Sequence, residues 1–192
     1  MDAKTVYLRE FGTPRFDASN TYVSDRATLM GDVELGAYSN IWPSAVVRGD
    51  GGGWVRIGTH CNVQDGAVIH GGEPAFCVQI GNFVTIAHCA MVHGGSIGDY
   101  VCIGIGAIVL DGSHIPSETI IGAGAVVSPG KKLEPGYIYM GAPAKPIRAL
   151  SDKDREWLRY NASLYVGLGQ KAITPDVITP PPASTGPQRV RF

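Results

Sequence analysis

Branched apolar residues recur at every sixth position over most of the chain. A glycine often follows them, as in Ile57-Gly58 and Ile97-Gly98. This period is typical of hexapeptide repeats and predicts a parallel β-helix. The series, called the ladder below, consists of Val23, Leu29, Leu35, Ile41, Val47, then Ile57, Val63, Ile69, then Ile80, Ile86, Val92, and finally Ile97, Ile103, Val109, Ile115, Ile121, Val127 and Leu133.

Each six-residue unit is expected to form a short strand and a turn, and three units close one triangular coil. The ladder residue points inward and stacks on its equivalent one coil away, about 4.8 Å along the axis. A single coil cannot bury its apolar face, so the stack is stable only as a whole. The ladder predicts about six coils within residues 21–140. The 26 glycines suit such a fold because its turns need positive φ angles.

The register of the ladder breaks at three places. Two insertions, of four and five residues, fall at the glycine-rich stretches 51–54 and 71–75. At the third place one residue is missing between Val92 and Ile97. Insertions in a solenoid usually project on one face, which is often the binding face, so we expect functional residues near these breaks.

The ladder accounts for neither end of the chain. We predict an N-terminal extension over residues 1–20, a linker and a packed helix over 141–170, and an extended proline-rich tail over 171–192. Ser151 and Asp154 resemble a capping box at the start of the helix. The helical residues expected on one face, against the coils, are Trp157, Asn161, Leu164, Tyr165 and Leu168.

Composition narrows the function classes. Charged residues make up 17% of the chain and the formal net charge is −1, which favours neither nucleic acid nor an anionic membrane as a partner. No apolar run approaches the roughly 20 residues of a membrane span, and residues 1–12 lack the apolar stretch of a signal peptide. The four cysteines form no Cys-x-x-Cys pair, so we predict a cytoplasmic protein with reduced thiols.

Three histidines fall at the register breaks. Arg48, His70 and His93 each follow a ladder residue, three units apart once the insertions are discounted, so they should form one outward column. Backbones about 4.8 Å apart let His70 and His93 bind one ion at Zn–N distances of about 2.0–2.1 Å. His88 belongs instead to the column of Asp65 on another face. A third ligand from His88 therefore requires a trimer with metal sites at the subunit boundaries.

The other two histidines, His60 and His114, lack this relation, and we assign them structural roles.

Several segments resemble the γ-class carbonic anhydrases, in order and over about residues 10–170. They are Trp42-Pro43-Ser44-Ala45-Val46-Val47-Arg48-Gly49-Asp50, Asn62-Val63-Gln64-Asp65-Gly66, the segment ending at His70, Ile86-Ala87-His88, and Val92-His93-Gly94. The resemblance implies that the β-helix is left-handed, which the spacing alone does not decide. It also implies a homotrimer.

Residue by residue, the resemblance implies roles for nine side chains. His70, His88 and His93 would be the metal ligands, with Zn²⁺ as the ion and Fe²⁺ or Co²⁺ as alternatives. Arg48 and Asp50 would form an ion pair between subunits, and Gln64 would orient the metal-bound water or hydroxide. Asp65 would be a carboxylate of the interface and the pocket, and Tyr165 a tyrosine of the pocket. Glu73 would be the acidic side chain that remains in the shortened loop, and it is a further catalytic candidate.

The chain departs from the best-studied active members of that family in three places. Gly51 stands where they carry a glutamate used in proton transfer. The acidic loop after the first ligand is cut short, which leaves Glu73 as its only carboxylate. Tyr165-Val166-Gly167 replaces a Tyr-x-Asn sequence. By these loops the chain is more similar to the short bacterial members.

The sequence thus predicts reversible hydration of CO₂ to bicarbonate by metal-bound hydroxide, slowed by the loss of the glutamate shuttle. Three alternatives stay open. They are a metal-dependent CoA-thioester hydrolase, a hexapeptide acyltransferase that uses histidine as a general base, and a non-catalytic trimeric subunit whose metal clamps the interface.

Overall fold

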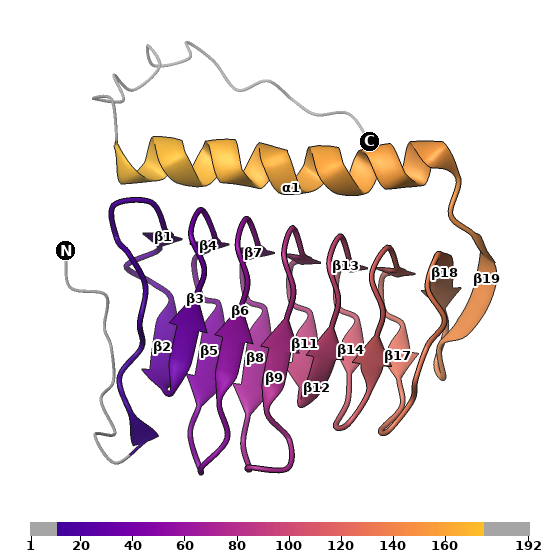
Figure 1. Cartoon of the computed structure of the whole chain (residues 1–192), viewed down its shortest axis with the longest axis horizontal. Coiled ribbons are helices and arrows are strands. Elements are labelled where there is room, and N and C mark those ends of the chain that lie inside the picture. The colour runs from indigo at the N-terminus through magenta and orange to yellow at the C-terminus, as the bar shows by residue number, and fades with distance from the viewer. Residues whose placement is uncertain (1–10, 175–192) are drawn as a thin grey trace, which may run out of the picture.

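The computed structural model describes residues 11–174. Short strands stack in parallel into a solenoid, and one long helix, α1 (Asp152–Ile173), runs along its side (Figure 1). The predicted fold class, a parallel β-helix of hexapeptide repeats with a C-terminal helix, is confirmed. Most of the proline-rich tail and half of the N-terminal extension lie outside the described residues.

Three sheets form the walls of the solenoid. The first sheet contains β1 (Tyr22–Val23), β4 (Asn40–Ile41), β7 (Asn62–Val63), β10 (Thr85–Ile86), β13 (Cys102–Ile103), β16 (Ile120–Ile121), β18 (Tyr137–Met140) and the antiparallel β19 (Lys145–Ala149). The second contains β2 (Thr28–Gly31), β5 (Val46–Gly49), β8 (Val68–Gly71), β11 (Met91–His93), β14 (Ile108–Val109) and β17 (Val126–Val127). The third contains β3 (Val33–Leu35), β6 (Val55–Ile57), β9 (Val78–Ile80), β12 (Gly95–Ile97) and β15 (His114–Ile115).

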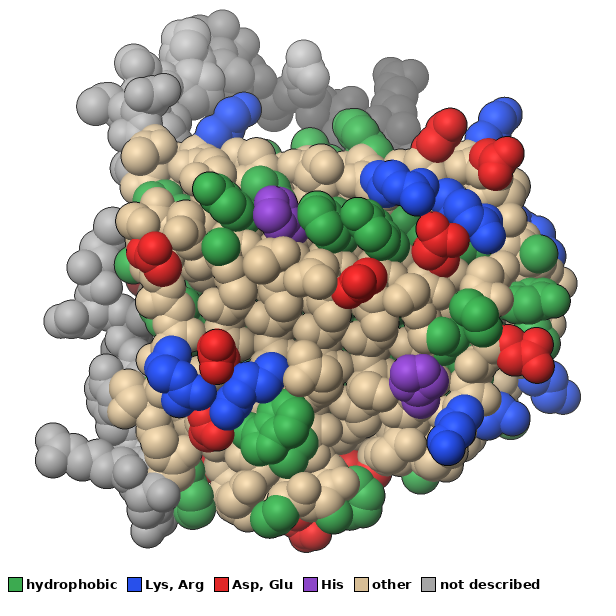
Figure 2. All heavy atoms as spheres, viewed as in Figure 1, with side chains coloured by type: hydrophobic (Ala, Val, Ile, Leu, Met, Phe, Trp, Pro, Cys, Tyr) green, Lys and Arg blue, Asp and Glu red, His purple; other side chains and the backbone are tan. Residues whose placement is uncertain are grey.

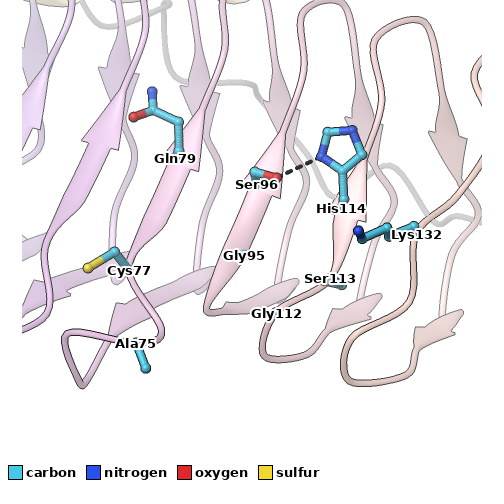
Figure 3. Close-up of a pocket in the computed structure, with 9 residues that line it drawn as sticks. All are labelled: Ala75, Cys77, Gln79, Gly95, Ser96, Gly112, Ser113, His114 and Lys132. Carbon is cyan, nitrogen blue, oxygen red and sulfur yellow. Dashed lines mark hydrogen bonds between the residues drawn. The ribbon is translucent and has the colours of Figure 1, made fainter.

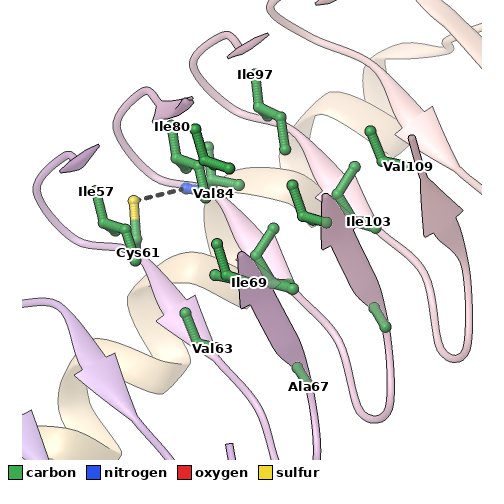
Figure 4. Packing of buried hydrophobic residues seen from close by; sticks show 14 of the residues in the cluster. Ile57, Cys61, Val63, Ala67, Ile69, Ile80, Val84, Ile97, Ile103 and Val109 are labelled. Carbon is green, nitrogen blue, oxygen red and sulfur yellow. Dashed lines mark hydrogen bonds between the residues drawn. The ribbon is translucent and has the colours of Figure 1, made fainter. Parts of the chain in front are cut away.

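The ladder forms the core. Val47 pairs with Ile69 and Ile69 with Val92, so equivalent residues lie directly above one another. Figure 4 shows other ladder side chains, such as Ile57, Ile80 and Ile97, pointing into the solenoid from successive coils. Ile69, Ile86 and Val92 are fully buried. Branched side chains suit this position because they pack well on pleated strands.

The ladder extends one step beyond its predicted end. Tyr139, six residues after Leu133, pairs with Ile121 and is buried. Its hydroxyl donates to the backbone carbonyl of Glu134 at 3.0 Å and accepts from the Glu134 N–H at 2.9 Å. The prediction that the pattern stops at Leu133 was wrong, because a search for branched aliphatic residues misses an aromatic ring whose polar end is satisfied by the backbone.

The capping box at the start of α1 is confirmed. The Ser151 side chain accepts from the Asp154 N–H, and the Asp154 carboxylate accepts from the Ser151 N–H at 2.7 Å. The packed face of the helix was predicted only in part. Asn161 and Tyr165 do lie against the coils, whereas other predicted members are exposed. The exposed members are Trp157, Leu164 and Leu168.

Small residues explain how the helix actually packs. Leu158, Ala162 and Gly169 are the buried residues of α1. A Cβ atom at Gly169 would lie 3.0 Å from the Cβ of Asn40, so the missing side chain lets the helix approach the first sheet. The remaining apolar face of α1, called the apolar stripe below, consists of Trp157, Leu164 and Leu168.

Two of the four cysteines should resist thiol reagents. Cys61 and Cys102 are buried, and burial raises the pKa of each thiol to about 12. The reactive species is the thiolate, so the folded protein at neutral pH should be labelled at neither position, while unfolded protein is labelled at all four. Mass-spectrometric mapping after a short alkylation tests this. Labelling of Cys61 as fast as that of the half-buried Cys77 would contradict it.

Within the described residues, no helix is long and apolar enough to cross a membrane. Figure 2 shows one face of the molecule, on which the middle is largely uncharged and the charged side chains of both signs gather toward the edges.

Candidate metal centre

The predicted column of outward side chains is present on the second sheet. Arg48 pairs in register with His70, and His70 with His93. The three strands that carry them, β5, β8 and β11, end at the corner where the insertions leave the solenoid. Strand pairing therefore fixes the backbones of the two histidines on adjacent coils.

The two imidazole rings face one another. His70 Nδ1 lies 3.1 Å from His93 Nε2, and the ring planes are inclined by 73°. Two nitrogens bound to one tetrahedral Zn²⁺ at about 2.0–2.1 Å would be about 3.3–3.4 Å apart. The observed separation is close to that value, so the pair fits a shared ion with little movement.

A carboxylate holds the far nitrogen of each ring. Asp50 Oδ1 lies 2.8 Å from His70 Nε2, and Asp111 Oδ1 lies 2.7 Å from His93 Nδ1. If both far nitrogens donate to these carboxylates, the two near nitrogens present lone pairs to each other. Two lone pairs at this distance repel unless a cation or a proton lies between them, so the donor set suits a metal ion.

His88 occupies a different corner, in register with Asp65. Its Nδ1 lies 3.1 Å from Asp65 Oδ2, and both side chains are half exposed. Among residues 11–174 of one chain, no group of three His, Cys, Asp or Glu side chains is placed to hold a metal ion. One chain thus brings His70 and His93 together and leaves His88 apart.

Arg48 and Asp50 form an ion pair within the chain, at 2.6 Å, where the family resemblance implied a pair between subunits. Burial raises the pKa of the Asp50 carboxyl, but hydrogen bonds from Arg48 and His70 outweigh it and hold that pKa below its ordinary value. Asp50 therefore stays ionised and links the guanidinium to the first histidine.

Gln64 is buried, and a chain of hydrogen bonds fixes the nitrogen of its side-chain amide. Its Nε2 donates to Asn62 Oδ1 at 2.9 Å, Asn62 Nδ2 donates to Thr85 Oγ1 at 2.9 Å, and Asn161 Nδ2 of α1 donates to the same hydroxyl at 2.9 Å. Among the described residues, no donor reaches the Gln64 side-chain carbonyl oxygen, which remains an available acceptor. Sequence reasoning missed Asn62 and Thr85, although both are polar at outward positions of a sheet that the helix covers.

Tyr165 lies beside the His88 corner. Its ring packs edge-on against Trp42, with centroids 5.7 Å apart. Burial, and then the negative charge of Asp65, raise the pKa of the Tyr165 hydroxyl, so it stays protonated. Tyr165, Asp65 and His88 therefore form a second polar group, separate from the His70–His93 pair.

Glu73 does not reach the histidines. It is exposed in the loop that follows β8, and its carboxylate makes no hydrogen bond or ion pair with another described residue. The prediction that Glu73 is a catalytic residue is therefore supported by no contact with the histidines.

The two insertions pack on each other, which explains the residue at position 51. Gly51 has φ +67°, and a Cβ atom there would lie 2.2 Å from the carbonyl oxygen of Gly72. A Cβ at Gly53 would likewise lie 2.3 Å from the carbonyl oxygen of Gly71. A glutamate cannot stand at position 51 without moving the neighbouring loop.

The remaining two histidines lie elsewhere. The His60 ring stacks on Phe83, with centroids 4.7 Å apart. His114 Nδ1 lies 2.7 Å from Ser96 Oγ on the third sheet, beside an open depression of about 570 Å³ (Figure 3). This depression is lined by Ala75, Cys77, Gln79, Gly95, Ser96, Gly112, Ser113, His114 and Lys132, none of which was predicted to be a site residue.

Known proteins resemble this chain over most of its length, although no family model matches it. Protein YrdA of Escherichia coli strain K12 is 42% identical over 153 residues, covering 75% of this chain and 81% of that protein. Gamma carbonic anhydrase 2, mitochondrial, of Arabidopsis thaliana is 31% identical over 156 residues, and the match spans 56% of its length.

A solved structure has the same architecture. The hexapeptide transferase family protein from Anaplasma phagocytophilum superposes with a TM-score of 0.79 at 30% identity, covering 86% of this chain and 95% of that one. The ladder in the sequence, the stacked coils of the structure and these matches all indicate the same family. The chain belongs to the hexapeptide-repeat family that includes YrdA and the gamma carbonic anhydrases.

Proposed function

We propose that this protein is a zinc-dependent carbonic anhydrase that hydrates CO₂ slowly and works as a homotrimer. The observation that carries the proposal is the pair of imidazole nitrogens, 3.1 Å apart, whose far sides are both held by carboxylates. This arrangement has no use in packing the solenoid, because the side chains point away from its core.

The outer face of the second sheet supports the assembly. Next to the histidine column runs a column of outward apolar residues, each only partly buried in the single chain: Val46, Val68, Met91, Ile108 and Val126. A continuous apolar column on a surface favours association. A closed ring of copies packed through this sheet would bring the His88 corner of one subunit to the His70–His93 pair of the next.

His70, His93 and the His88 of a neighbour would hold the ion. Three neutral imidazoles would suit Zn²⁺, and the bound ion would lower the pKa of water to about 7 and so supply hydroxide at neutral pH. Gln64, with its amide nitrogen engaged by Asn62, offers its carbonyl oxygen as an acceptor that orients the nucleophile. Tyr165 remains protonated and can donate a hydrogen bond at the same corner as His88.

Removal of the proton is the slow step of the proposed reaction. Gly51 has no side chain to carry a proton, and Glu73 is not hydrogen-bonded to the histidines. Protons therefore leave through solvent and buffer, which limits the turnover rate more than it limits metal binding.

Turnover should accordingly depend on the buffer. Protein loaded with Zn²⁺ should hydrate CO₂ above the rate of the free ion, and small imidazole buffers should raise kcat with little change in kcat/KM. Stopped-flow measurement with a pH indicator tests this, with metal content measured on the same sample. The variant His114→Ala is a matched control, since His114 lies on the third sheet, and it should retain full activity. A fully loaded protein with no rate above free Zn²⁺ would reject the proposal.

The apolar stripe favours one second candidate, hydrolysis of an acyl-CoA thioester. Trp157, Leu164 and Leu168 lie exposed on α1, the helix that also supplies Tyr165. An acyl chain could pack on such a surface. A panel of acyl-CoA substrates with a free-thiol assay distinguishes the two reactions, and transfer of the acyl group to an added amine would identify an acyltransferase instead.

A further inference from the structure

We infer that Asp111 is a positioning residue for the metal centre and that it holds His93 in the tautomer whose Nε2 is free to bind metal. This inference rests on the proposed function for its purpose, but its geometry stands on its own. Asp111 was not among the residues predicted from the sequence. It follows β14, one coil beyond His93.

The contact between the two side chains is short and direct. Asp111 Oδ1 lies 2.7 Å from His93 Nδ1, and both groups are about one-third exposed. Within residues 11–174, His93 is the only side chain that pairs with this carboxylate. An ionised carboxylate can only accept a hydrogen bond, so Nδ1 carries the proton and Nε2 carries the lone pair.

The backbone fixes the place of this carboxylate. The Asp111 carbonyl oxygen accepts from the Gly130 N–H at 2.7 Å, which ties the turn to the next coil. Gly94, directly after His93, has φ +69°, and a Cβ atom there would lie 2.6 Å from Asp111 Oδ1. The glycine thus leaves the room that the carboxylate occupies.

Asp111 differs from the carboxylate that holds the other ring. Asp50 contacts His70 but is also paired with the Arg48 guanidinium, which offsets its charge. Asp111 has no Lys or Arg partner among the described residues. The carboxylate of Asp111 is therefore engaged by His93 and not by a guanidinium or ammonium group. Carboxylates in this position typically raise the affinity of a histidine ligand for metal.

The first test needs no metal. In ¹⁵N-labelled protein stripped with a chelator, histidine NMR should show His93 as the Nδ1–H tautomer. In Asp111→Ala the ring should move toward the Nε2–H tautomer, whereas Asp111→Asn should keep the Nδ1–H tautomer because the amide oxygen still accepts. An unchanged tautomer in Asp111→Ala would overturn the inference.

The second test measures metal binding. Asp111→Ala should bind Zn²⁺ about 10- to 100-fold more weakly in chelator competition, and its Co²⁺ absorption spectrum should change. Asp111→Asn should recover part of the affinity. Glu156→Ala, which removes an exposed carboxylate from α1, should match the wild type, and circular dichroism confirms that each variant is folded.

The outcomes separate the two proposals. A wild-type protein that binds no Zn²⁺ rejects the proposed function, while the tautomer experiment still decides the role of Asp111. A wild-type protein that binds Zn²⁺ together with an Asp111→Ala variant of equal affinity and equal Co²⁺ spectrum rejects only the inference about Asp111.

Discussion

Two variants that are each inactive, His70→Ala and His88→Ala, should regain metal sites and activity when they assemble together. In the proposed trimer each site takes His70 and His93 from one chain and His88 from its neighbour. A site is intact when a His88→Ala chain supplies the pair and a His70→Ala chain supplies His88. Random mixing of equal amounts should restore about a quarter of the sites. Zinc content and CO₂ hydration, measured after the mixed chains are unfolded and refolded, should rise together from background.

A third variant provides the control. His70 and His93 must come from the same chain, because their strands pair directly within one solenoid. A mixture of His70→Ala with His93→Ala therefore contains no chain with an intact pair and should stay at background. No recovery in the first mixture would contradict a site shared between subunits. Recovery in this mixture would contradict a site that takes His70 and His93 from the same chain.

Replacing Ile86 by alanine should cost about 2–5 kcal/mol of unfolding free energy. Ile86 is fully buried in the middle of the ladder, in register with Val63 below and Ile103 above. Neighbouring residues cannot move to fill the space that the removed side chain leaves, because strand pairing on both sides holds the backbone in place. The loss is the transfer free energy of the removed groups plus that of the cavity they leave.

The measurement is denaturant unfolding at one fixed protein concentration, because assembly contributes to apparent stability. The matched control is Ile147→Ala. Ile147 lies on β19 and is 60% exposed, so the same truncation should change stability by less than about 0.5 kcal/mol. Equal effects of the two substitutions would mean that burial of the ladder residues does not stabilise the solenoid.

The repeat and the histidine column could be predicted from the sequence because both depend only on spacing along the chain. Once six residues make one side of a coil, the positions of His70 and His93 relative to each other follow by counting. The end of the ladder did not follow, because Tyr139 meets the packing requirement with a different kind of side chain.

Contacts between coils were harder to predict. Asp111 reaches His93 from a turn 18 positions away, and neither the residue type nor the spacing marks it among the other polar turn residues. The packed face of α1 was misjudged for a related reason. Close approach at Ala162 and Gly169 decides that face, while a count of large apolar residues selects a neighbouring face, about a quarter turn away around the helix.

The contact between Gly51 and Gly72 limits how the proposed activity could be improved. A designer who wished to restore an acidic proton relay would first try Gly51→Glu, yet the new side chain would need both a left-handed backbone and the space held by the other loop. The shorter engineering route is to lengthen the 71–77 loop and carry the acid there, leaving the tri-glycine turn as the fixed support on which that longer loop would rest.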